Sequence, residues 1–116
     1  MSAAQSKMQN SHALLLQRRA ELRDRLVRLR VDLRRDSEPL SPDFAEQASE
    51  RETEEVLNSL YVGTSAELDA VNHALERIAD GSYGFCDKCG GPIEPDRLAA
   101  VPQAEYCGRC AQSSRR

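Results

Sequence analysis

Two segments with heptad-spaced apolar residues, a proline-containing turn between them and two Cys-x2-Cys pairs after them predict a mainly α-helical protein. The predicted fold is a long antiparallel two-helix coiled-coil hairpin with a C-terminal four-cysteine zinc finger. We place the hairpin in residues 1–82, with an acidic tip near residues 37–48, and the zinc finger with its short tail in residues 83–116. This architecture suits a chain of 116 residues with 4% aromatic residues and no Trp, because a helical hairpin buries only one seam.

The first helix is predicted from about residue 11 to residue 35, a stretch without Gly or Pro. Its leucines alternate at spacings of four and three residues, which is typical of a coiled-coil seam. Arg19 falls on the same stripe and is its weak point. Residues 1–7 are small and polar, and we expect a frayed start there. The seam leucines are Leu15, Leu22, Leu26, Leu29 and Leu33.

A turn is predicted over residues 36–44, where two prolines and two serines lie close together. Ser41, Pro42 and Asp43 have the order of an N-cap residue, a first-position proline and a first-turn acid. These signals indicate that a second helix begins here.

The second helix is predicted to run to about Ala79, and Asp80-Gly81 closes it. Gly63 interrupts this helix, at a cost of about 1 kcal/mol relative to Ala. Two interleaved heptad series predict its buried face. They consist of Leu57, Thr64, Val71 and Ile78, and of Tyr61, Leu68 and Leu75.

Charges divide between the helices, with arginines along the first and acids at the start of the second. Cross-helix pairing explains most of them. Asp43 and Glu46 lie beside the turn, where the first helix offers few partners. Stabilisation of a helix N-terminus, worth about 0.3–1 kcal/mol, is one interpretation of these two acids. The net charge of −3 argues against a protein that coats DNA.

The four cysteines come as two pairs with 17 residues between them: Cys86, Cys89, Cys107 and Cys110. Two cysteines three apart on a tight turn can direct both sulfurs to one metal ion, and two such knuckles complete a tetrahedron. The alternatives are a redox dithiol pair, two disulfides or an iron–sulfur cluster. We predict one structural Zn2+, because all four ligand positions are thiols and none is left open for catalysis.

The segment around the cysteines has too few large apolar residues to fold alone, so metal binding must supply the folding free energy. These residues are Tyr83, Phe85, Ile93, Leu98, Val101 and Tyr106. No enzyme signature is present, and His12 and His73 lack the spacing of metal ligands or of a catalytic triad. We expect His73 to be a solvated surface residue. The absence of a secretory or membrane-spanning segment predicts a cytoplasmic protein.

From about Leu15 to Cys110 the sequence resembles the DksA/TraR family (DnaK suppressor proteins), in its short form. The resemblance is strongest in "DGSYGFCDKCGGPIEPDRLAAVPQAEYCGRC". It implies a transcription regulator that inserts its coiled coil into the secondary channel of RNA polymerase and does not bind specific DNA. The family's tip pattern, Asp-x-x-Asp-x-Ala, is matched by Asp43, Glu46 and Ala48, with Glu replacing the second Asp. The resemblance implies that these tip residues contact the polymerase near its active centre.

Family members that respond to (p)ppGpp use basic residues late in the second helix and after the zinc finger. Gly63, Ala66, Ala70 and Ala111 stand at such places in this sequence, while Arg97 remains as a candidate contact for phosphate or polymerase. We therefore expect a weak or absent (p)ppGpp response. A monomer without membrane contact is also expected.

Two other functions stay open from the residues alone. The zinc finger and the arginine-rich helix could bind nucleic acid directly, although net acidity and the lack of stacking aromatics oppose this. Alternatively, the cysteines could sense oxidants by releasing zinc. The alternative to a polymerase regulator is therefore a nucleic-acid-binding or redox-sensing zinc-finger protein that does not act on RNA polymerase, although redox sensing could also accompany the polymerase role.

Overall fold

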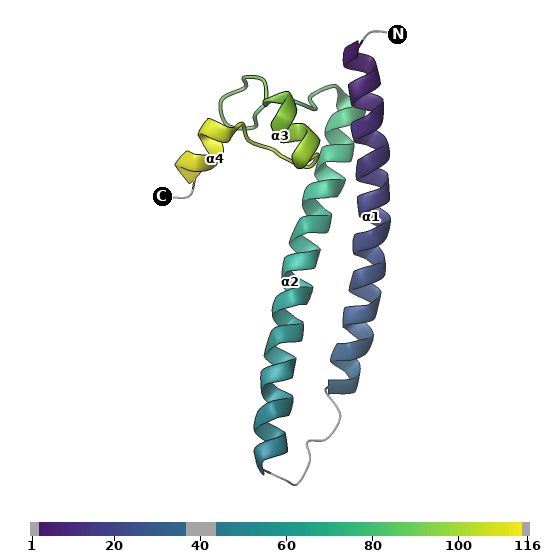
Figure 1. Ribbon diagram of the computed structural model, residues 1–116, viewed down its shortest axis with the longest axis vertical. Coiled ribbons are helices and arrows are strands. Elements are labelled where there is room, and N and C mark those ends of the chain that lie inside the picture. Colours follow the sequence, from purple (N-terminus) through teal and green to yellow (C-terminus); the bar gives the residue numbers. More distant parts are fainter. Residues whose placement is uncertain (1–2, 37–43, 115–116) are drawn as a thin grey trace. The chain divides into compact units, whose positions relative to one another are not determined.

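The computed structural model describes the backbone of residues 3–36 and 44–114, and the side chains of residues 8–35 and 51–113. These residues form two long helices, α1 (Ala3–Asp36) and α2 (Phe44–Asp80), and two short ones, α3 (Pro95–Ala100) and α4 (Gly108–Ser114) (Figure 1). No strand forms within the described ranges; Phe85 and Pro92 make an isolated antiparallel bridge. The predicted mainly α-helical class is confirmed, and the two long helices contact each other.

The chain divides into two compact units. One, here called the hairpin unit, consists of Glu21–Leu68. The other, here called the finger unit, consists of Met1–Ala20 and Asp69–Arg116. Each long helix therefore contributes to both units.

The hairpin unit is built on the predicted heptad seam. Leu22 and Leu29 of α1 and Thr64 of α2 are buried. The Arg30 guanidinium donates a 3.3 Å hydrogen bond to the Tyr61 hydroxyl and links the two helices. The remaining seam residues of this unit are half-buried: Leu26, Leu33, Leu57, Tyr61 and Leu68. The 4-3 spacing thus correctly predicted which side chains face inward.

In the finger unit, the first part of α1 and the last part of α2 bury Leu15, Val71 and Ala74. Figure 1 shows these helix segments side by side, and loops after α2 lead to α3 and then to α4. Leu15 and Val71 were both predicted from the heptads, whereas Ala74 lies between the two predicted series.

The predicted start of the first helix needs correction. The helix α1 begins at Ala3, so residues 3–7 are helical rather than frayed. This segment contains neither Gly nor Pro, and its Ala and Gln residues are good helix formers. The helix α2 continues through Gly63, as its predicted span to about Ala79 requires, and an added Cβ at Gly63 would meet nothing within 4 Å. The glycine therefore lowers local helix stability without breaking the helix.

The predicted end of α2 is confirmed. The helix ends at Asp80, and Gly81 follows with φ of +84°, a conformation that glycine adopts without strain. The Ser82 amide donates a 2.9 Å hydrogen bond to the Arg77 carbonyl, which caps the last turn. The predicted start signals, Ser41, Pro42 and Asp43, lie outside the described residues. Within the described ranges, none of the helices is both long and apolar enough to cross a membrane.

Candidate metal centre

A buried arginine shapes the entry to the zinc-finger segment. Arg77, in the last turn of α2, is 5% exposed. Its guanidinium donates to the carbonyl oxygens of Ser82, at 3.2 Å, and of Phe85. Its own carbonyl accepts from the amides of Ser82 and Tyr83. A single side chain and its backbone therefore fix the path from the helix to the first cysteine.

The first knuckle is a tight backbone turn around Cys86. The Cys86 amide donates to the Gly91 carbonyl at 2.7 Å, and the Gly90 amide donates to the Cys86 carbonyl at 2.9 Å. Gly90 has φ of +75°, which a side chain would strain. This turn brings the Cys89 sulfur back beside that of Cys86.

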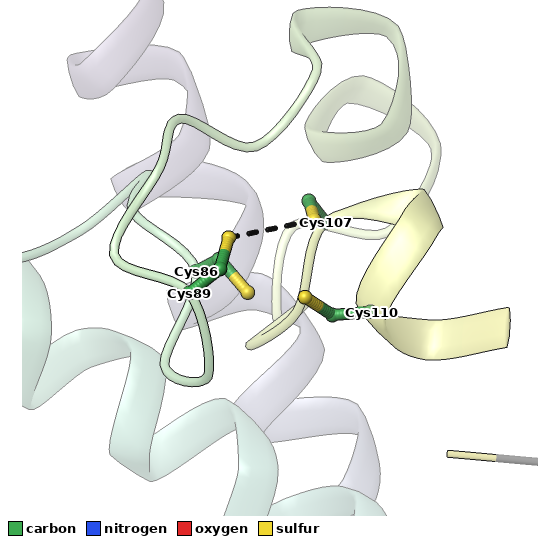
Figure 2. A group of neighbouring side chains, drawn as sticks. All are labelled: Cys86, Cys89, Cys107 and Cys110. Carbon is green, nitrogen blue, oxygen red and sulfur yellow. Dashed lines mark hydrogen bonds between the residues drawn. The ribbon is translucent and has the colours of Figure 1, made fainter. Parts of the chain in front are cut away.

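The four cysteines predicted as ligands meet at one point. Their sulfurs all lie within 4.8 Å of one another, and those of Cys89 and Cys107 are 3.9 Å apart. Figure 2 shows the sulfurs of the first pair facing those of the second pair. A tetrahedral zinc ion with Zn–S bonds of about 2.3 Å places its sulfurs about 3.8 Å apart. The arrangement therefore fits Zn2+.

The pKa values of these thiols indicate that a nearby cation is needed to keep all four as thiolates. Burial disfavours the Cys86 thiolate, but amides of Cys89, Cys107 and Lys88 outweigh burial and lower the pKa of Cys86 to about 6. Hydrogen bonds with Cys107 and Cys86, together with burial, raise the pKa of Cys110 to about 12. Four thiolates in this space therefore need a neighbouring positive charge, which a divalent metal supplies.

The apolar core beneath the cysteines is small, as predicted. Ile93 is buried against Cys86 and Cys107, and Leu98 packs on the edge of this cluster. By contrast, Phe85 is 50% exposed. Val101 and Tyr106 are also exposed. Apolar burial of this extent does not hold a domain together without a further constraint.

Side chains outside the cysteines position the second knuckle. A Glu94 carboxylate oxygen accepts a 3.1 Å hydrogen bond from the Gly108 amide at the start of α4. The Arg97 Nε donates to the Tyr106 carbonyl at 2.8 Å, just before Cys107. The two contacts connect the residues around α3 to the segment that carries the last two cysteines.

Two family models cover this architecture. The "DnaK suppressor protein-like, N-terminal domain" matches residues 12–78, and the "Prokaryotic dksA/traR C4-type zinc finger" matches residues 81–116. The chain belongs to the DksA/TraR family. The C4-type finger of this family and the clustered cysteines together indicate one structural zinc ion.

Proteins of similar sequence include a named member of this family. The RNA polymerase-binding transcription factor DksA of Caulobacter vibrioides is 40% identical over 63 residues, which is 53% of this chain and 44% of that protein. An uncharacterized protein of Aquifex aeolicus is 42% identical over 64 residues, which is 55% of this chain and 44% of that protein. These matches therefore span less than half the length of the curated relatives.

Solved structures match over a longer stretch. The transcription factor DksA2 from Pseudomonas aeruginosa is 31% identical with a TM-score of 0.82, over 99% of this chain and 90% of that chain. The DnaK suppressor protein from Agrobacterium tumefaciens is 41% identical with a TM-score of 0.62, over 90% and 91% respectively. The DksA fold therefore covers both units of this chain.

The side chains of the predicted tip residues lie outside the described part of the structure. Asp43 lies outside the described residues. Glu46 and Ala48 belong to the first turns of α2, and their side chains also lie outside the described part. Arg97 is described, and its Nε donates a hydrogen bond to the Tyr106 carbonyl, which is a structural contact. Its role toward phosphate or polymerase stays a prediction.

His73 is 43% exposed, and it also has a partner in the zinc finger that the sequence did not predict. Its Nδ1 donates a 2.8 Å hydrogen bond to the Glu105 carboxylate, and this bond raises the pKa of His73. The two residues are 32 positions apart, so no local sequence pattern announces the contact. Arg77 was missed for a similar reason, since its partners belong to a loop.

Proposed function

We propose that the chain is a DksA-type transcription regulator that binds RNA polymerase. The observation that carries this proposal is the likeness to DksA2 of Pseudomonas aeruginosa, which extends over 99% of this chain and 90% of the other. It includes both long helices and the zinc finger, so the likeness is not confined to a common coiled coil. The name of the Caulobacter relative adds the polymerase as the partner.

In this proposal, Cys86, Cys89, Cys107 and Cys110 hold the zinc ion. Their sulfurs lie within one tetrahedral shell, and no fifth metal-binding side chain belongs to their cluster among the described residues. The zinc supplies positive charge to four thiolates and a rigid link between the two knuckles. Its role is structural, and the protein is not an enzyme.

The proposed action lies at the turn between α1 and α2. Each helix is about 10–12 Å wide, so a pair of them is narrow enough to enter a channel that excludes a globular domain. Asp43 and Glu46 would then carry negative charge into the secondary channel, with Ala48 in contact with its wall. Carboxylates act on charged groups within the Debye length of about 8 Å at physiological salt.

We propose further that (p)ppGpp has little effect and that the chain binds no specific DNA. Phosphate binding needs clustered donors, and the Nε of Arg97 already donates to the Tyr106 carbonyl. The net charge of −3 opposes tight binding to the DNA backbone. The protein would act as a monomer in the cytoplasm.

A reconstituted transcription assay tests the proposal. The full zinc-loaded chain is added to purified bacterial RNA polymerase on one stable-RNA promoter and one biosynthetic promoter. The expected result is a change in initiation with the parent and a loss of that change with Asp43→Asn/Glu46→Gln. A matched control is Glu52→Gln/Glu55→Gln, which removes two exposed acids at the same spacing further along α2.

The control variant should regulate like the parent. An inactive parent would contradict the function, and an active tip variant would contradict the tip mechanism alone. Equal loss in both double variants would show that general acidity, rather than the tip, is responsible.

A further inference from the structure

A second group of metal-binding side chains lies beside the cysteine cluster. It consists of His73 from the last third of α2, Asp87 from the first knuckle and Glu105 from the segment before the second knuckle. One ligand atom from each lies within 4.8 Å of the others. All three residues belong to the finger unit.

Backbone contacts hold this group in place. The Asp87 amide donates a 2.8 Å hydrogen bond to the Glu105 carbonyl, so the two carboxylate residues are paired through their main chains. Each lies within two residues of a cysteine of the zinc cluster. The His73 Nδ1 is 2.8 Å from the Glu105 carboxylate. The group is therefore fixed by three separate segments, unlike a chance cluster of mobile surface acids.

The donor set selects a class of ion. One imidazole nitrogen with two carboxylate oxygens suits Zn2+ and related divalent transition metals, whereas Mg2+ and Ca2+ prefer oxygen ligands alone. Ligand atoms around a tetrahedral ion with bonds of about 2.0–2.2 Å lie roughly 3.3–3.6 Å apart. The separations of 2.8 Å and up to 4.8 Å lie on either side of that value. Small side-chain rotations would bring the three atoms to one ion.

Exposure and charge favour an ion here. The side chains of His73 and Glu105 are 43% and 28% exposed, so an ion can enter and solvent can complete its shell. The hydrogen bond that His73 donates to Glu105 raises the pKa of His73, and the charges of Glu105 and Asp87 add to this effect. The same negative surroundings attract a divalent cation.

We propose that His73, Asp87 and Glu105 form a second, weaker binding site for Zn2+-like divalent ions. The bound ion ties α2 to the segments that carry both knuckles of the zinc finger and stiffens the finger unit. This site does not depend on polymerase binding or on the proposed tip mechanism.

Calorimetric titration of the full chain with ZnCl2 tests the proposal. The starting protein carries one zinc per chain by elemental analysis. We expect the parent to bind one further zinc ion and His73→Gln to bind it at least about tenfold more weakly, since the imidazole ligand is lost. Glutamine retains a hydrogen-bond donor for Glu105, so this variant keeps the contact to the finger. His12→Gln, at an exposed histidine of α1, is the matched control and should bind like the parent.

Thermal unfolding provides a second readout. An ion that binds the folded chain raises its unfolding temperature, so added zinc should stabilise the parent and His12→Gln more than His73→Gln. The proposal is overturned if the one-zinc parent takes up no further zinc at millimolar concentration. It is also overturned if His73→Gln binds and responds like the parent.

Discussion

The hairpin unit and the zinc finger of one short chain are stabilised in different ways. The hairpin unit buries a repeated seam that includes Leu22 and Leu29, so each turn of helix adds a similar apolar contact. The finger buries Ile93 beside cysteines and relies on backbone hydrogen bonds that close tight turns. One region therefore depends on many small contributions, and the other on one ion. Perturbations that target either source should separate the two.

Loss of a zinc ligand should have the largest effect and should be confined to the finger. Cys107→Ser removes one thiolate from the four-sulfur cluster. Structural zinc contributes about 10–16 kcal/mol of apparent free energy to small metal-dependent folds, so the finger should unfold in this variant. Hydrogen exchange should become fast across residues 83–110 and remain slow in the central part of α1.

The control for this variant is Ser113→Ala, at an exposed serine of α4. It should keep one zinc per chain and the exchange pattern of the parent. Slow exchange throughout the finger of zinc-free Cys107→Ser would show that apolar packing, rather than metal, holds the finger.

A cavity in the seam should destabilise the hairpin unit and leave the zinc finger intact. Leu22 is fully buried, so Leu22→Ala should destabilise the hairpin unit by about 2–5 kcal/mol. Urea unfolding followed by circular dichroism measures this change, and zinc content should stay at one per chain. Val27→Ala, at a side chain that is 58% exposed, should change stability by less than about 0.5 kcal/mol. Similar losses from both variants would contradict the assigned seam.

Replacing Arg77 tests whether the loop between α2 and Cys86 depends on the hydrogen bonds that the guanidinium donates. Arg77→Met keeps much of the apolar volume but leaves the carbonyls of Ser82 and Phe85 without the guanidinium. An unsatisfied buried polar group costs about 1–3 kcal/mol, so amides near the first knuckle should exchange faster and zinc should be chelated more readily.

For comparison, Arg28→Met replaces an exposed arginine of α1 and should leave chelation unchanged. If Arg77→Met released zinc no faster than Arg28→Met, the loop would be held by the metal alone.

The smallest predicted effect is an increase in stability rather than a loss. Gly63 lies inside α2 with open space around its Cβ position, so Gly63→Ala should stabilise the helix by up to about 1 kcal/mol. Ala66→Gly, three residues on at an exposed position, should destabilise it by a similar amount. Urea midpoints that move the same way in both variants would indicate that backbone propensity does not control this part of the hairpin unit.

The fold was predictable wherever the sequence is periodic. Spacings of four and three residues identified Leu15, Leu22 and Leu29 as buried, because helix geometry places such residues on one face. The start of α1 was not predicted, since residues 3–7 lack apolar periodicity but still have high helix propensity. Periodicity therefore predicts the seam better than the ends of the helices.

The candidate metal centre was predictable only in part. The spacing of the cysteines predicted their cluster, because two residues three apart share one turn. Arg77 and the His73–Glu105 pair were not predicted, since their partners come from loops or from 32 positions away. Such contacts depend on how the finger folds back on α2, and no local pattern encodes that.

Direct binding to bacterial RNA polymerase tests the proposed function most simply. Sedimentation velocity with the labelled 116-residue chain, loaded with one zinc ion, measures binding to the purified polymerase and, separately, to duplex DNA. We predict a complex with one chain per polymerase and no binding to DNA at physiological salt. Absence of a complex with the polymerase, or equal binding to DNA alone, would contradict the assignment of this chain as a polymerase-binding regulator.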